Sequence, residues 1–246
     1  MDLKRRIREA LPQKYIYTLL HLKKSLPFIG GLAIKSFSGN GEDIILSHYL
    51  FKNKKNGFYV DVGSFHPKII SNTYLLYKRG WHGINIDPNP KTHKLFNKYR
   101  PNDVNLKIGI AERASEKTYY NFSYSGANTF DETFGEQKTN KSWNTLLSKE
   151  TLHCEPLKSV FEAHVPKNTK IDLLDVDVEG LDLEVLKSND WSLYRPAVIL
   201  VEDKEFRSHP GSSDVYVFLK EQGYTFHSYM DITLVMTEVG FHRNAD

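Results

Sequence analysis

The sequence predicts an α/β domain built around a mostly parallel β-sheet. From residue 40 onward, short apolar runs alternate with segments of helical periodicity, which is typical of strand–helix–strand units. Several of the apolar runs end in a carboxylate, so acidic side chains gather at one edge of the expected sheet. A chain of 246 residues has room for one such domain with some additions, but not for two of ordinary size.

Three strands and two helices are expected in the first half of this domain. The strands are "GFYVDVG" (57–63), "HGINIDP" (82–88) and "DVNLKIGI" (103–110). The helices between them are "SNTYLLYKRG" (71–80) and "PKTHKLFNKYR" (90–100). The stretch 113–156 is more polar and aromatic, and there we expect one further strand around "KTYYNF" (117–122) within an insertion.

The strand and helix alternation resumes after the insertion. The expected elements are a strand over "KIDLLDVDVEG" (170–180), a helix over "LDLEVLKS" (181–188), a strand over "RPAVILVED" (195–203) and a helix over "SDVYVFLKEQG" (213–223). The tail "YTFHSYMDITLVMTE" predicts two strands, which we expect to close the sheet as an antiparallel pair. Open sheets of this kind bind ligands at the carboxyl ends of their strands.

The loop after the first strand, "VDVGSFHP", points to a cofactor without phosphates. A dinucleotide-binding turn needs several glycines so that the backbone can approach a pyrophosphate, and here Gly63 stands alone. A single glycine after an acidic strand end suits a cofactor whose charged part is an amino-acid head. We expect Asp61 to accept from its ammonium group and Gly63 to let the chain pass close to it.

The second acidic strand end supports the same cofactor. Asp87 in "INIDPNP" lies 24 residues beyond Gly63, where a carboxylate after the second strand accepts hydrogen bonds from ribose hydroxyls. An adenosine with an amino-acid tail describes S-adenosylmethionine. The alternative is that Asp87 only begins a turn with Pro88.

Three segments carry a family resemblance over roughly residues 37–203. "FSGNGEDIIL", "GFYVDVGSFHPKIISNTYLLYKRGWHGINIDPNP" and "IDLLDVDVEGLDLEVLKSNDW" resemble the FkbM family of S-adenosylmethionine-dependent methyltransferases. The resemblance implies the class I methyltransferase (Rossmann-like) fold, with a seven-stranded sheet, a reversed last strand and helices on both faces. It also implies a cofactor site that includes Glu42, Asp61, Gly63, Ser64, Asn72 and Asp87. One departure is Gly39, where relatives often have glutamine.

The segment "DVDVEGLDLEVL" matches the family pattern "IDVEG" at Asp177, Glu179 and Gly180, whereas a carboxylate at Asp175 is less expected. Asp177 and Glu179 are two residues apart, so both can point to one side of a strand. Asp182 and Glu184 follow at an expected helix N-terminus, where we expect them to be solvated. Asp177 is therefore our candidate for an active-site carboxylate.

Methyl transfer to an alcohol needs help at the acceptor, because a hydroxyl is poorly nucleophilic until its proton leaves. A general base or a divalent metal can supply that help. Asp177, Glu202 and Asp203 offer the hard oxygens that Mg²⁺ or another divalent cation prefers, although FkbM relatives do not generally use a metal in this way. The competing hypothesis is a lone base, for which His66 and His209 are candidates besides Asp177.

Charge and cysteine usage restrict the partners. Residues 1–35 hold eight Lys and Arg against two acidic residues, so the body over residues 36–246 is mildly acidic and a nucleic-acid substrate is disfavoured. We expect the basic arm to form short amphipathic helices that pack on the domain, on a second subunit of a homo-oligomer, on a membrane surface or on a partner enzyme. The arm lacks the pattern of a signal peptide or a membrane span, and the single cysteine, Cys154, favours a reducing compartment, hence the cytoplasm.

The function that we expect is O-methylation of a sugar hydroxyl in a nucleotide-linked or surface-glycan precursor, as part of polysaccharide biosynthesis. The fold and the cofactor depend on several residues, whereas the acceptor depends on analogy with the family. Alternatives are methylation of another small metabolite at oxygen or nitrogen, and a non-catalytic module that retains the fold and binds a partner. The missing phosphate-binding glycines weaken a nicotinamide-dependent oxidoreductase.

Overall fold

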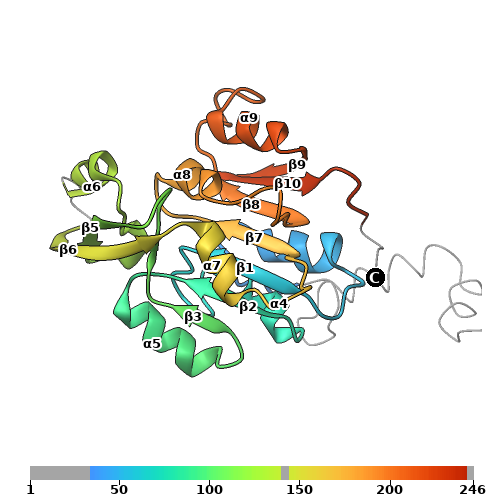
Figure 1. Cartoon of the computed structure of the whole chain (residues 1–246), viewed down its shortest axis with the longest axis horizontal. Helices are drawn as coiled ribbons and strands as arrows, with labels where there is room; N and C mark the ends of the chain where they lie inside the picture. Colours follow the sequence, from blue (N-terminus) through green and yellow to red (C-terminus); the bar gives the residue numbers. More distant parts are fainter. Residues whose placement is uncertain (1–33, 140–143, 243–246) are drawn as a thin grey trace, which may run out of the picture. The chain divides into compact units, whose positions relative to one another are not determined.

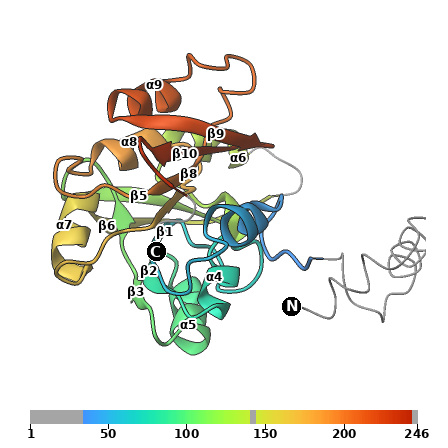
Figure 2. The ribbon, with the colours of Figure 1, turned by 90° about the vertical axis from the view of Figure 1, so that its right-hand side faces the viewer.

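A seven-stranded sheet forms the centre of the protein. The computed structural model describes residues 34–139 and 144–242, so nearly all of the predicted basic arm lies outside the described residues and its division from the body stays a prediction. The strands are β1 (Phe58–Val62), β2 (His82–Ile86), β3 (Val104–Leu106), β7 (Leu173–Val176), β8 (Val198–Glu202), β9 (Tyr224–Met230) and β10 (Thr233–Glu238). Their order is β3-β2-β1-β7-β8-β10-β9, with β3 at one edge and β9 at the other (Figures 1 and 2).

The pairing confirms the predicted fold class. β3, β2, β1, β7 and β8 run parallel, and β10 runs antiparallel to both of its neighbours, β8 and β9. The sheet is thus mostly parallel with a reversed last strand, as the class I methyltransferase fold requires. Successive strands add outward from β1 on one side and from β7 on the other, so the topological switch point lies between β1 and β7. Ligands bind at such a point in open α/β sheets.

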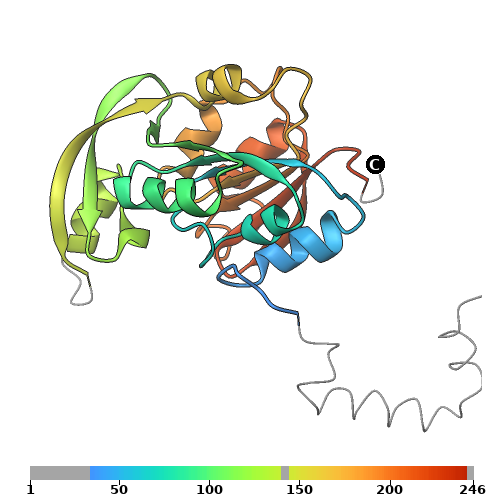
Figure 3. The same cartoon turned by 90° about the horizontal axis from the view of Figure 1, so that it is seen from below.

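Helices cover both faces of the sheet. They are α3 (Glu42–Ile44), which continues into the π-helical segment η1 (Ile45–Leu50), α4 (Tyr74–Lys78), α5 (Pro90–Tyr99), α7 (Leu157–His164), α8 (Asp182–Lys187) and α9 (Asp214–Glu221). Leu46, Leu50 and Leu76 pack with one face of the central strands, and the apolar side chains of α7, α8 and α9 pack with the other. Figure 3 shows α7 and η1 on opposite sides of the sheet. Within the described residues, no helix has both the length and the apolar character that crossing a bilayer requires.

A second, three-stranded sheet interrupts the alternation. It contains β4 (Gly109–Ile110), β5 (Ser115–Phe122) and β6 (Leu146–Glu155), in the order β4-β6-β5. The 3₁₀ turn η2 (Ser125–Ala127) and helix α6 (Glu132–Thr139) lie between β5 and β6. The single strand predicted over 103–110 is wrong in one respect: the chain leaves the main sheet after Leu106 and joins the second sheet at Gly109. The sequence pattern predicts neither β6, half of whose residues are exposed, nor α7.

One buried arginine fastens the loop after β1 to the main sheet. The side chain of Arg100, at the end of α5, is completely buried. Its guanidinium donates from Nε to the Pro67 carbonyl (2.9 Å), from Nη2 to the Ser71 hydroxyl (2.7 Å) and from Nη1 to the Thr73 hydroxyl (2.7 Å). It also donates to the side-chain oxygen of Asn85 on β2 (3.2 Å). Because the Ser71 and Thr73 hydroxyls accept hydrogen bonds from this guanidinium, residues 71–73 stay in the loop. Helix α4 therefore begins at Tyr74 and not at residue 71 as predicted.

We expect Arg100→Ala to lower the free energy of unfolding by about 3–5 kcal/mol, the range for removing one partner of a buried charged network. The Ser71 and Thr73 hydroxyls and the Pro67 carbonyl would lose their donor in the buried interior of the protein. Urea denaturation followed by circular dichroism measures the change, with the exposed Arg113→Ala as the control. Equal stability of the two variants would contradict this role of Arg100.

Candidate functional site

A cavity opens at the carboxyl ends of β1, β2 and β7, at the topological switch point. Its floor comes from the main sheet, through the residues that end β1, β2 and β7 and the loops that follow them. Its other wall comes from the insertion, through Tyr119, Tyr124, Ser125, Gly126, Asn128, Thr129 and Phe130. The cavity is therefore built from two elements, one that belongs to the common sheet and one that is added to it.

Five of the six predicted cofactor residues line this cavity: Asp61, Gly63, Ser64, Asn72 and Asp87. The sixth, Glu42, is not among the lining residues. Its buried carboxylate accepts hydrogen bonds from the Asn40 backbone amide (2.8 Å) and from the Thr233 hydroxyl (3.2 Å). The cofactor-binding role of all six stays a prediction, with geometric support for the five in the cavity.

The sequence predicts that Gly63 lets the chain pass close to a cofactor. The structure shows a second reason why this position needs glycine. Its φ is +83°, a left-handed conformation that favours glycine, and a Cβ there would lie 1.8 Å from the Asp177 carbonyl oxygen. The loop after β1 thus packs directly on the end of β7. Any larger residue would push these two strand ends apart at the floor of the cavity.

Asp87, the predicted ribose acceptor, also stabilises the chain around it. One carboxylate oxygen accepts from the Phe65 amide (3.1 Å) and the other from the Asn89 amide (2.7 Å), so Asp87 does stabilise the turn that begins with Pro88. The same side chain lines the cavity. Burial raises the pKa of Asp87 to about 7, against the two backbone donors that favour the charged form.

Ser64 offers a polar group that the protein itself does not satisfy. Ser64 is 4% exposed and lines the cavity. Its hydroxyl has no hydrogen-bond partner among the described residues. Buried hydroxyls are nearly always hydrogen-bonded, so such an orphan in a cavity wall is consistent with a polar ligand beside it.

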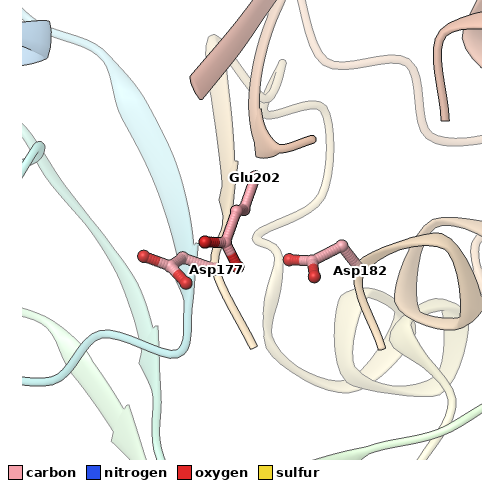
Figure 4. Close-up of side chains that lie close together, drawn as sticks. All are labelled: Asp177, Asp182 and Glu202. Atoms are coloured by element: carbon pink, nitrogen blue, oxygen red, sulfur yellow. The ribbon is translucent and has the colours of Figure 1, made fainter. Parts of the chain in front are cut away.

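Three carboxylates gather beyond the ends of β7 and β8. Figure 4 shows the side chains of Asp177, Asp182 and Glu202 close together, and an oxygen of each lies within 4.8 Å of the others. The predicted set contained Asp203 in place of Asp182. The Asp203 carboxylate instead accepts from the Phe206 amide (3.0 Å) and the Ser213 hydroxyl (2.6 Å), and so stabilises the turn that follows β8.

The expectation that Asp182 is solvated is wrong. Asp182 is 6% exposed, and its carboxylate turns back to accept from the backbone amides of Val178 (3.1 Å) and Gly180 (3.2 Å). Burial, reinforced by the neighbouring Glu202, raises the pKa of Asp182 to about 7. Asp182 thus shapes the loop that carries Glu179.

Asp177 is the carboxylate of this cluster that lines the cavity, where its side chain is exposed. Although Asp177 is accessible from the cavity, the surrounding protein desolvates its carboxylate in part, and this desolvation, together with the carboxylates of Glu202 and Asp182, raises the pKa of Asp177 well above its usual range. A carboxylate with a raised pKa is an effective proton acceptor near neutral pH.

A lysine that the sequence analysis did not single out completes the cluster. Lys204 Nζ lies 2.7 Å from the Glu202 carboxylate and 3.6 Å from that of Glu179. Lys138, on α6 of the insertion, lies 3.3 Å from the same Glu179 oxygen. Lys204 directly follows "VED", so a search for a counter-charge beside that acidic pair could have found it.

The two candidate histidines lie outside the cavity lining. His66 Nδ1 accepts from the Lys68 and Ile69 amides, both at 3.1 Å, so this ring nitrogen fixes the loop after β1. Burial, with Arg100 and Lys68 nearby, lowers the pKa of His66. His209 is exposed in the turn after β8. Their catalytic roles stay predictions, and the geometry favours Asp177 over both.

Comparison with known proteins agrees with this geometry. The family model described as "Methyltransferase FkbM domain" matches residues 61–226, which is more than half of the chain. Those residues contain the carboxyl end of β1 and all of β2, β7 and β8, and therefore the strand ends that form the floor of the cavity. Neither the curated proteins nor the solved structures yielded a match.

We expect the affinity for S-adenosylhomocysteine to rise about tenfold between pH 6 and pH 8. With a pKa of about 7, Asp87 is mostly protonated at pH 6, and only the carboxylate accepts hydrogen bonds from two ribose hydroxyls. Calorimetric titrations across this range measure the change. In Asp87→Asn the rise should disappear, and a rise of the same size in that variant would show that another group is responsible.

Proposed function

The chain belongs to the FkbM methyltransferase family, and we propose that it methylates a sugar hydroxyl of a nucleotide-linked or surface-glycan precursor. Membership makes the protein an S-adenosylmethionine-dependent methyltransferase. The acceptor, a place in polysaccharide biosynthesis and a cytoplasmic location are parts of the proposal. The observation that carries it is the position of Asp177, a carboxylate of raised pKa that faces the same cavity as the cofactor residues.

The residues present fit S-adenosylmethionine. Asp87 lies where a ribose needs an acceptor, Gly63 holds the loop close to the strand ends, and the orphaned Ser64 hydroxyl lies in the wall. When bound, this cofactor supplies a methyl group on a positively charged sulfur, so the electrophile is already activated. The protein has to position the acceptor and remove its proton.

Asp177 would remove that proton. A base must lie within hydrogen-bond reach of the hydroxyl in the bound acceptor, and Asp177 is the residue of the carboxylate cluster that opens on the cavity. The positive charge of Lys204, beside Glu202, would stabilise the negative charge of the carboxylates while Asp177 is still deprotonated. We propose this lone-base mechanism because Asp182 already serves two backbone amides and Glu202 already has a cationic partner.

The wall formed by the insertion suits a sugar. It includes three aromatic residues, Tyr119, Tyr124 and Phe130, and the hydroxyl residue Ser125. Aromatic faces pack against the C–H groups of a sugar ring, while a hydroxyl both donates to and accepts from sugar hydroxyls. A small aromatic or amine acceptor would need less of this mixed surface.

The proposed acceptor class is tested by methyl transfer from labelled cofactor to nucleotide sugars and to glycan extracts, with mass spectrometry of the product. We expect a mass increase of one methyl group on a sugar hydroxyl. Products methylated at nitrogen, or on a non-sugar metabolite only, would refute the acceptor class but not the methyltransferase. Turnover of no acceptor by a chain that binds the cofactor would favour the non-catalytic module.

We expect Asp177→Asn to lower kcat by about 10²- to 10⁴-fold, the usual contribution of a general base, with little change in cofactor affinity. Because the pKa of Asp177 is raised, the activity of the native chain should fall as the pH is lowered through that pKa and Asp177 is protonated. Asp214→Asn, at an exposed position, is the matched control.

Chelation distinguishes the lone base from a divalent-metal site, which the sequence predicts at Asp177, Glu202 and Asp203 and for which the structure brings together Asp177, Asp182 and Glu202. If the lone base acts, EDTA and added Mg²⁺ should leave the rate of methyl transfer unchanged. Loss of turnover on chelation, restored by Mg²⁺, would show that a divalent cation activates the hydroxyl instead.

A further inference from the structure

Two carboxylates lie side by side at the floor of the cavity, on the strands that flank the switch point. Asp61 on β1 and Asp175 on β7 are register partners, so their side chains leave the sheet on the same face. Adjacent strands are about 4.8 Å apart, which brings the two carboxylates together. Each residue is 5% exposed, and each lines the cavity.

The partners of the two carboxylates differ. Asp61 accepts from the Thr73 hydroxyl (2.6 Å), behind which lies the guanidinium of Arg100. Asp175 accepts only a neutral donor, the side-chain amide of Asn72 (3.2 Å). Among the described residues, Asp175 forms no ion pair, so its side of the pair lacks the positive charge that Asp61 has nearby.

The cavity as a whole is acidic. Its lining contains five carboxylates and no Lys, Arg or His: Asp61, Asp87, Asp175, Asp177 and Glu179. Asp87 at the end of β2 faces the expected ribose, and Glu179 is paired with lysines. Asp61 and Asp175 are therefore the carboxylates left to bind the end of the cofactor opposite the ribose. A positive group at that end would offset the repulsion between the two carboxylates.

We propose that Asp175, together with Asp61, binds the ammonium group of the cofactor's amino-acid tail and so determines recognition of that tail. An ammonium group has three N–H donors, which two carboxylates can accept, whereas a sulfonium has none. Asn72 orients the Asp175 carboxylate through its amide. The inference rests on the methyltransferase assignment but not on the identity of the acceptor.

Three ligands test the inference by calorimetry: S-adenosylmethionine, S-adenosylhomocysteine and 5′-methylthioadenosine, which lacks the amino-acid tail. In Asp175→Asn, the first two should bind about ten- to hundredfold more weakly, the range for a hydrogen bond to a charged group. Binding of 5′-methylthioadenosine should not change. This pattern assigns the loss to the tail and needs no acceptor and no turnover.

Every other pattern overturns the proposal. Equal weakening of all three ligands would mean a general distortion of the cavity, and weakening of S-adenosylmethionine alone would place Asp175 beside the sulfonium. Unchanged affinities would remove Asp175 from recognition. Asp172→Asn is the matched control: it makes the same chemical change just before β7, at a residue that serves the Phe58 amide and does not line the cavity.

A second variant keeps the test valid if Asp175→Asn does not fold. Asn72→Ala leaves both carboxylates in place and removes only the amide that orients Asp175. We expect about a three- to tenfold loss for the two ligands with a tail and none for 5′-methylthioadenosine, since only the hydrogen bond that orients the Asp175 carboxylate is removed. An equal loss for 5′-methylthioadenosine would overturn the assignment in this variant too.

Discussion

The buried guanidinium of Arg100 is the interaction on which the floor of the cavity depends. A buried cation needs partners on every N–H, and Arg100 takes most of them from the loop that joins β1 to α4. That loop carries Ser64 and Asn72 into the cavity, and its Thr73 hydroxyl connects the arginine to Asp61. Arg100, which directly follows α5, thereby holds this loop in shape. The loop contains few glycines, so its shape depends on these hydrogen bonds more than on the backbone freedom of glycine.

The same site gathers carboxylates in spite of their repulsion, because parallel strands deliver their carboxyl ends to one edge. The protein limits the repulsion locally: Asp87 and Asp182 each accept two backbone amides, and Glu202 and Glu179 are paired with Lys204. Burial still raises the pKa of Asp87 and of Asp182 to about 7. An acidic cavity with raised pKa values suits a cofactor that carries positive charge and a reaction that begins with the loss of a proton.

The sequence predicts the main sheet and the floor of the cavity, because strand periodicity and strand-end carboxylates are local patterns. It fails where burial is decided by distant contacts. Nothing local distinguishes Arg100 from the exposed basic residues of α5, and Asp182 looks like an ordinary acid at a helix N-terminus until the preceding turn brings two amides to it. The sequence also does not predict β6, because a half-exposed strand of an added sheet has little apolar periodicity.

The turn after β7 joins the two halves of the site. Glu179 (φ +54°) and Gly180 (φ +115°) both adopt left-handed conformations, which for a glutamate is uncommon and costs conformational energy. The turn is held because the Glu179 carbonyl accepts from the Thr129 hydroxyl of the insertion (2.9 Å), while its carboxylate meets Lys138 of α6 and Lys204 beyond β8. The floor of the cavity thus lies on the main sheet and the opposite wall on a separate element, with Glu179 as their connection. Side chains on that wall can therefore change the shape of the cavity while the strand ends of the floor stay in place.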